Sequence, residues 1–140
     1  MAELVATYQT ALLALAFLAF TLTLQSFIAG AYKNGVMNQA SGMPVEGSQD
    51  DLVFRIVRTH MNGVENFSAF FALSILGIIA GASVKWLTWL ILATVALRML
   101  YWLLYYVRIG SDNGGIRSIT HVLALVVNLA IGVLVLLALM

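Results

Sequence analysis

Residues 54–67 read FRIVRTHMNGVENF, a polar stretch that opens an otherwise apolar segment. At about 100° per residue, Arg58, Asn62 and Glu65 fall within about 60° on one face of a helix, with Arg55 beside them. Arginines that snorkel to lipid head groups would explain Arg55 and Arg58, but not the two deeper residues. Ionisable side chains inside a membrane normally face a bundle interior or a wet cavity. The stretch therefore predicts a membrane helix with an inward polar face.

Apolar segments surround this stretch on both sides. The chain has 140 residues, of which 62% are hydrophobic and 9% charged, and its mean hydropathy is +0.99. These values exclude an ordinary soluble domain, which is about 25% charged. Four segments reach or approach the ~20 residues that cross a bilayer, and we expect spans at about 4–31, 52–82, 86–108 and 117–140. The expected fold is one all-α integral membrane domain over residues 1–140, a bundle of four transmembrane helices.

The distribution of cations predicts how this bundle is oriented. The first and third loops and their flanks carry five cations, which are Lys33, Arg55, Arg58, Arg108 and Arg117. The opposite side carries only Lys85 and the N-terminus. The positive-inside rule then places loops 32–51 and 109–117 in the cytosol and both termini on the opposite side.

The third span repeats the combination of a deep cation with polar neighbours. Arg98 lies near the middle of that apolar span, and Tyr101 and Tyr105 share its helix face. An unpaired arginine at this depth costs at least about 2.5–3.5 kcal/mol, so Arg98 requires a partner. Glu65 is the candidate, and the pair is either purely structural or part of a ligand site.

The fourth span begins with Arg117 and Ser118, and His121 follows one turn later. With the second and third spans, these residues predict a basic, hydroxyl-rich pocket at the cytosolic end. Arginines bind carboxylates bidentately, Glu65 can accept from an amine, and a hydroxyl beside an arginine stabilises a thiolate. Glutathione carries this set of groups. The chain contains no cysteine, so any thiol must come with a ligand.

The segment RTHMNGVEN at residues 58–66 resembles the signature of the MAPEG family, the membrane-associated proteins in eicosanoid and glutathione metabolism. It is most similar to the microsomal glutathione transferase branch. RMLYWLLY at residues 98–105 resembles the family's arginine followed by two tyrosines, and IRS at 116–118 resembles its fourth-helix start. The resemblance implies a homotrimer that binds glutathione between subunits and takes a lipophilic co-substrate from the membrane lipids.

The resemblance also assigns roles by position. It implies catalytic roles for Arg117, Ser118 and Tyr105. It implies glutathione contacts for Arg58, Asn62, Glu65, Tyr101 and Tyr105, and Lys33 stands where the family often has an arginine. Arg55, which lies beside the polar face of its helix, and His121, at a position that is often tyrosine in one branch of the family, are further expected contacts. His60 points away from Asn62 and is expected to hydrogen-bond within the bundle. The stretch GSDNGG at residues 110–115 lengthens the loop before Arg117 relative to the family pattern.

These features favour a membrane glutathione transferase, with glutathione-dependent peroxidase activity as a related possibility. The alternative is a non-catalytic member of the family that binds lipid or serves as an accessory subunit of a membrane complex. Ligation of a haem by His60 and His121 is a third hypothesis. No metal-ligand set and no basic tract for nucleic acid are present in the sequence. Small residues four apart, at Ser68 and Ala72 and at Gly77 and Gly81, favour close contacts between subunits.

Overall fold

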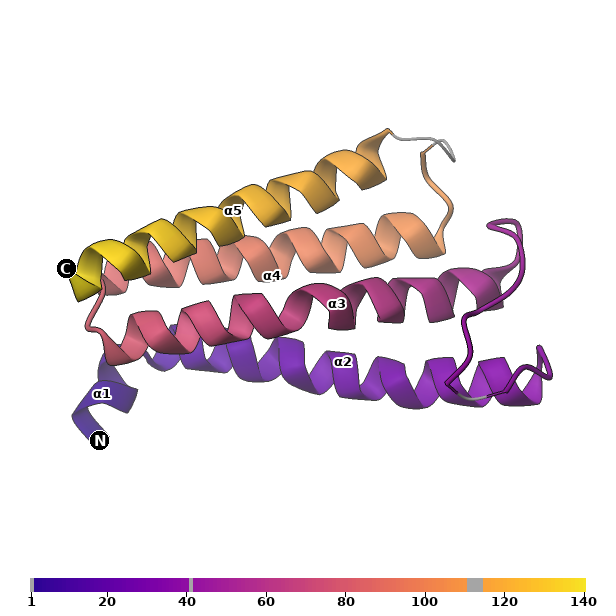
Figure 1. Cartoon of the computed structure of the whole chain (residues 1–140), viewed down its shortest axis with the longest axis horizontal. Helices are drawn as coiled ribbons and strands as arrows, with labels where there is room; N and C mark the ends of the chain where they lie inside the picture. Colours follow the sequence, from indigo (N-terminus) through magenta and orange to yellow (C-terminus); the bar gives the residue numbers. More distant parts are fainter. Residues whose placement is uncertain (1, 41, 111–114) are drawn as a thin grey trace.

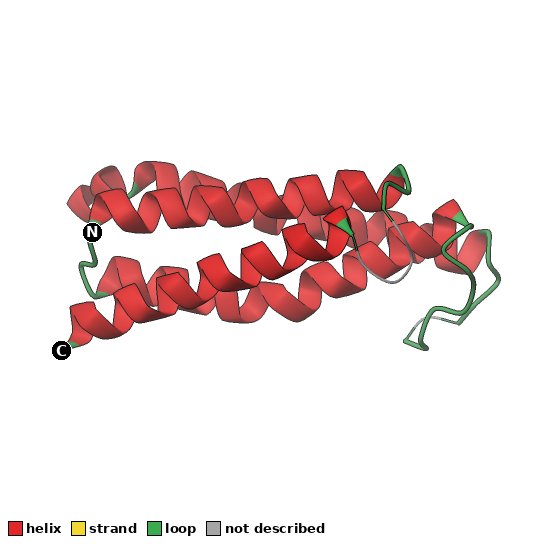
Figure 2. Ribbon diagram, turned by 90° about the horizontal axis from the view of Figure 1, so that it is seen from above, coloured by secondary structure: helices red, strands yellow, loops and turns green. Residues whose placement is uncertain are grey.

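The computed structural model describes residues 2–40, 42–110 and 115–140, and within these ranges the only regular structure is helical (Figure 2). The helices are α1 (Ala2–Thr7), α2 (Gln9–Gly35), α3 (Leu52–Ile79), α4 (Val84–Tyr106) and α5 (Ile116–Leu139). The last four are each long and apolar enough to cross a membrane. The chain is therefore an integral, multi-pass membrane protein, and the predicted all-helical fold is confirmed.

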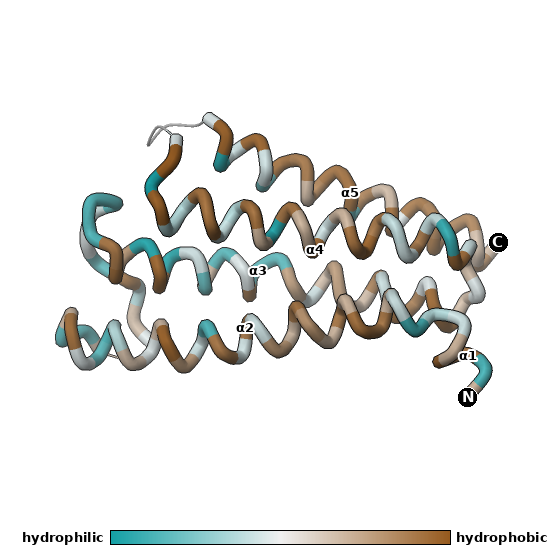
Figure 3. The backbone as a smooth tube through the Cα atoms, turned by 180° about the vertical axis from the view of Figure 1, so that it is seen from behind, coloured by the Kyte–Doolittle hydropathy of each residue, from teal (hydrophilic) through white to brown (hydrophobic). Residues whose placement is uncertain are grey.

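The four long helices run side by side, with both termini at one end of the bundle and the α2–α3 loop at the other (Figure 1). Helices α2, α3 and α4 pack against one another, and α5 packs against α3 and α4. The hydrophilic positions of α3 lie in the half of that helix nearest the α2–α3 loop (Figure 3). This half of α3 positions the polar site, and the other half belongs to the apolar core.

The first predicted span differs from the observed helices at both ends. The helix breaks at Tyr8, whose φ and ψ are −106° and 20°, so that α1 is separate from α2. The Tyr8 hydroxyl donates to the carbonyl of Ala82 at 2.5 Å, which ties the break to the α3–α4 turn. At the other end α2 continues to Gly35, because Lys33 is buried in its last turn and donates to the carbonyl of Met43.

Two glycines let α3 approach its neighbours closely. A Cβ at Gly63 would lie 2.7 Å from a methyl carbon of Leu22 on α2, and one at Gly77 would lie 3.0 Å from Leu87 on α4. Gly77 therefore packs within its own chain, and the prediction that it faces another subunit is wrong. Ser68 and Ala72, which form the other predicted pair of small residues, are exposed.

Candidate functional site

A cavity of about 160 Å³ opens between α3, α4 and α5 at the end of the bundle that carries the α2–α3 loop. Its lining residues are Gln49, Asn62, Tyr101, Tyr105, Arg117, Ser118, His121 and Val122. We call it the Arg117 pocket. Three helices contribute to it, so the folded bundle brings together six of the residues that the sequence singled out.

Arg117 is the cation of this pocket and is only 5% exposed. Its Nη1 donates to Oε1 of Gln49 at 2.9 Å, and its guanidinium carbon lies 4.8 Å from the centre of the Tyr105 ring. A guanidinium at this distance from an aromatic ring is attracted to the ring's electrons. The amide of Gln49 and the ring of Tyr105 are therefore two of the groups that hold Arg117 at the pocket.

Aromatic rings form one wall of the Arg117 pocket. Tyr101 and Tyr105 are one helical turn apart on α4, with ring centres 5.6 Å apart, and the Tyr101 and His121 rings are 5.8 Å apart. Nδ1 of His121 is buried and has no hydrogen-bond partner among the described residues. A buried polar atom of this kind calls for a partner beyond the described residues, and a ligand or a water molecule in the pocket would supply one.

Asn62 connects the Arg117 pocket to the interior of the bundle. Its Oδ1 accepts a hydrogen bond of 2.9 Å from Nη1 of Arg98, and its backbone carbonyl accepts from Asn66 at 2.8 Å. The partner that Arg98 requires is therefore the amide of Asn62. The predicted pairing of Arg98 with Glu65 is wrong, because the Glu65 side chain is exposed and forms no ion pair with Arg98.

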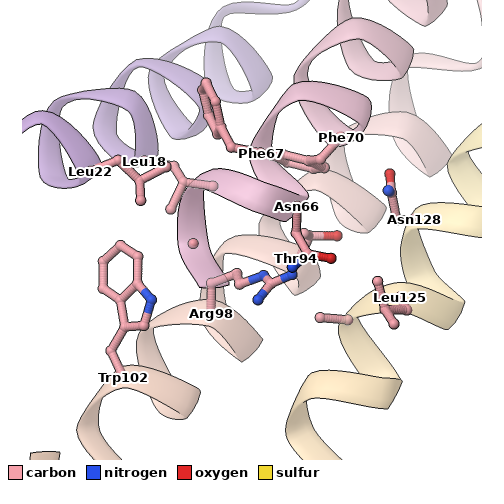
Figure 4. Close-up of a pocket in the computed structure, with 12 residues that line it drawn as sticks. Leu18, Leu22, Asn66, Phe67, Phe70, Thr94, Arg98, Trp102, Leu125 and Asn128 are labelled. Atoms are coloured by element: carbon pink, nitrogen blue, oxygen red, sulfur yellow. The ribbon is translucent and has the colours of Figure 1, made fainter. Parts of the chain in front are cut away.

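Arg98 also lines a second, internal cavity, which lies deeper between the helices (Figure 4). Arg98 reaches from α4 toward the side chain of Asn66 on α3, and Asn128 stands on α5 at the far side. Apolar side chains such as Leu18 and Phe70 form much of the remaining wall. The cavity has about 10 Å³ of free space, which is close to the minimum that one water molecule requires.

Arg55 does not line the Arg117 pocket, although the sequence predicted it as a ligand contact. Its Nε donates to the carbonyl of Tyr106 at 3.3 Å, and its Nη1 donates to the carbonyls of Gln49 and Asp50 at 2.7 and 2.9 Å. The structure gives this arginine a role in holding the α2–α3 loop.

Three other predicted contacts lie outside the Arg117 pocket of the same chain. Arg58 and Glu65 are exposed on α3 and do not line the pocket, although Arg58 interacts electrostatically with Tyr101 and Glu65 with His121. Lys33 lines a different cavity of about 290 Å³ between α2 and α3, and His60 lines it too.

His60 therefore points away from Asn62 as expected, but its buried Nδ1 has no hydrogen-bond partner among the described residues. Because His60 and His121 line different cavities, they are not arranged to bind one haem.

Sequence reasoning missed Gln49, which lies in the irregular α2–α3 loop. Its only sequence signal is its position, two residues before Asp51, whose side chain caps α3 by accepting from the backbone N–H of Val53. The predicted effect of the GSDNGG stretch falls largely on residues 111–114, which lie outside the described residues. Arg108, just before that stretch, forms an ion pair with Asp50.

Comparison with protein families gives a match to the MAPEG family over residues 8–137. Searches among curated proteins and among solved structures returned no significant match. The matched region includes α2, α3, α4, all but the last two residues of α5, and every described residue of the Arg117 pocket. The chain belongs to the MAPEG family.

Proposed function

We propose that this protein is a membrane glutathione transferase of the microsomal branch of the MAPEG family. The observation that carries the proposal is the convergence of a buried arginine, two tyrosines and a serine in the Arg117 pocket. These are the groups that bind and stabilise an anionic sulfur. A chain without cysteine needs glutathione, or a similar small thiol, to use them for sulfur chemistry.

The proposed chemistry begins with loss of the thiol proton to water. A free thiol has a pKa of about 8.5, so only a few per cent of it is ionised at pH 7. The positive charge of Arg117 lowers this pKa, and the hydroxyls of Tyr105 and Ser118 donate hydrogen bonds to the thiolate. The thiolate then attacks an electrophilic carbon of a lipophilic co-substrate. A carbon–sulfur bond forms, and the leaving group departs with its electron pair.

The same thiolate supports a peroxidase reaction on a lipid hydroperoxide. Sulfur attacks the terminal oxygen and becomes a sulfenic acid, the oxygen–oxygen bond breaks, and the departing lipid alkoxide takes a proton from water and leaves as the alcohol. A second glutathione then converts the oxidised sulfur to the disulfide and water. Both reactions gain from a site that holds the thiolate next to a substrate dissolved in the bilayer.

We also propose that neighbouring subunits of a homotrimer complete the site. The pocket of about 160 Å³ in one chain is smaller than the roughly 300–1,000 Å³ of typical ligand pockets. Lys33, Arg58 and Glu65 offer the charges that would bind the two ends of the peptide, yet none of them lines this pocket. In this arrangement the α2–α3 loop and the site face the cytosol.

Stopped-flow absorbance of thiolate formation on the detergent-purified protein tests the proposal. We expect glutathione to bind and to release a proton at pH 7. Binding without thiolate formation would favour the non-catalytic, lipid-binding alternative. Absence of binding at millimolar glutathione would refute the proposed function.

A further inference from the structure

Arg98, in the middle of α4, has more hydrogen-bond donors than the described residues satisfy. Its side chain is 6% exposed, and a guanidinium carries five N–H groups. Among the described residues it makes one side-chain hydrogen bond, from Nη1 to Oδ1 of Asn62, and no ion pair. Hydrocarbon offers no acceptor, so the other donors must find one inside the bundle.

Asn128 on α5 shows the opposite deficit. Its Oδ1 is buried and has no hydrogen-bond partner among the described residues. Asn128 and Arg98 line the same internal cavity, and they reach it from two different helices (Figure 4). A buried acceptor and spare donors therefore border one small space between α4 and α5.

The size and polarity of this cavity identify what it holds. Its free space of about 10 Å³ is close to that of a single water molecule. Nε1 of Trp102, a donor, lines it too and has no partner among the described residues. Water both donates and accepts, so it suits a wall with N–H groups and a carbonyl oxygen. A chloride ion is larger than water and cannot donate to Oδ1 of Asn128.

We infer that the internal cavity binds one water molecule, which accepts a hydrogen bond from the Arg98 guanidinium and donates one to Oδ1 of Asn128. This water links α5 to α4, and the bond from Arg98 to Asn62 extends the link to α3. The resulting polar chain crosses the apolar interior and ends at Asn62 in the wall of the Arg117 pocket. It joins the helices whether or not the pocket holds glutathione, so the inference goes beyond the proposed function.

A high-resolution structure of the wild-type protein, crystallised in the presence of bromide, tests the inference directly. We expect one density peak within about 2.7–3.2 Å of both a guanidinium nitrogen of Arg98 and Oδ1 of Asn128. The peak should give no anomalous signal from bromide. A bromide signal would assign the cavity to an anion and overturn the inference. A cavity without density, or an Asn128 amide bonded directly to Arg98, would overturn it as well.

A double-mutant cycle with Arg98→Met and Asn128→Leu tests the bridge by its energetics. Unfolding in detergent should show that the two changes are coupled by roughly threefold or more in the unfolding equilibrium constant, because either one removes a partner of the same water. Additive effects in this cycle would overturn the inference.

Ser74→Ala replaces Asn128→Leu in the matched control cycle. Ser74 on α3 is fully buried and its Oγ has no partner among the described residues, but it does not line the cavity. Its effect should therefore add to that of Arg98→Met. Equal coupling in the two cycles would show a general response of the core and would refute the bridge. If Arg98→Met does not fold, the density in the wild-type structure decides.

Discussion

Arg117 and Arg108 lie at the same end of the bundle but differ in burial. At 5% exposure its charge is poorly hydrated, and its observed partners include a neutral amide and an aromatic ring. A buried cation interacts more strongly with a nearby anion than an exposed one does, because burial reduces screening by water. By contrast, Arg108 and Asp50 form an exposed ion pair, which is worth about 0–1 kcal/mol.

Arg117→Ala should separate binding from activation. We expect glutathione affinity to change by no more than several-fold, since other polar groups remain in the pocket. The pKa of the bound thiol should rise by about one unit or more, and turnover at pH 7 should fall by about tenfold or more. Because the thiolate is the reactive form, raising the pH should restore turnover. Steady-state kinetics across a pH series measures both effects.

Arg108→Ala is the comparison for that experiment, because it removes an arginine at the same end of the bundle that is paired outside the pocket. Its effect on the thiol pKa should be smaller than that of Arg117→Ala. Full activity in Arg117→Ala together with loss in Arg108→Ala would reassign the thiolate-stabilising role to Arg108.

The hydrogen bond between Arg98 and Asn62 makes a prediction about stability. Asn62→Leu leaves the buried guanidinium without this acceptor and should lower the free energy of unfolding by about 1.5–3 kcal/mol. The double variant Asn62→Leu/Arg98→Met removes both polar partners and should recover most of that loss. Unfolding in detergent, measured by circular dichroism for the single and double variants, gives the coupling energy. Simple addition of the two single losses would show that the residues act independently.

At the scale of the elements, α3 provides both a polar contact to the pocket and a close apolar contact to α2. In its half near the α2–α3 loop, Asn62 lines the Arg117 pocket. The next residue, Gly63, faces α2 and packs against Leu22. Successive positions on a helix point about 100° apart, so a polar contact and a close apolar contact can alternate along the same turn. The close approach of α2 and α3 therefore depends on the lack of a side chain at Gly63.

Gly63→Ala should destabilise the bundle, whereas Gly132→Ala should not. The new methyl at position 63 would lie 2.7 Å from Leu22, and overpacking of this kind costs about 1–3 kcal/mol. At position 132 the nearest atom, on Leu73, is 3.6 Å away, so the higher helix propensity of alanine should stabilise by up to about 1 kcal/mol. Thermal unfolding of both variants checks the contrast. Equal stability of the two variants would mean that Leu22 moves aside without cost.

Helical periodicity predicted the elements and much of the pocket, because it fixes which side chains share a face. Asn62, Tyr101 and Arg117 each lie on the pocket-facing side of a different helix, as periodicity predicted for these polar faces. Periodicity does not specify which atoms satisfy a side chain. It therefore misassigned Arg55, whose guanidinium binds loop carbonyls, and it could not detect Gln49, whose position is set by an irregular loop with no period.

At the scale of the whole molecule, the polar groups of one chain are divided between faces. The Arg117 pocket opens between α3, α4 and α5, and the Lys33 cavity lies between α2 and α3. Arg58 and Glu65 are exposed on α3 beside the Arg117 pocket. An acidic side chain that faces hydrocarbon costs on the order of 2.5–3.5 kcal/mol. A chain in which Glu65 faced hydrocarbon would bear this cost, and a protein neighbour on the exposed side of α3 would remove it.

We expect that neighbour to be another copy of the chain, in a homotrimer. Ser68 and Ala72 lie on the same exposed face of α3 as Glu65, and small residues let membrane helices approach closely. Ala72→Trp should therefore shift the assembly toward smaller species and weaken glutathione binding. Phe27→Trp, at a position of α2 that is already aromatic and 77% exposed, should leave both unchanged. Native mass spectrometry in mild detergent should give three chains for the wild type. A monodisperse wild-type monomer that still binds glutathione would contradict this prediction. It would show that one chain completes the site alone and that Glu65 can remain exposed to lipid or water.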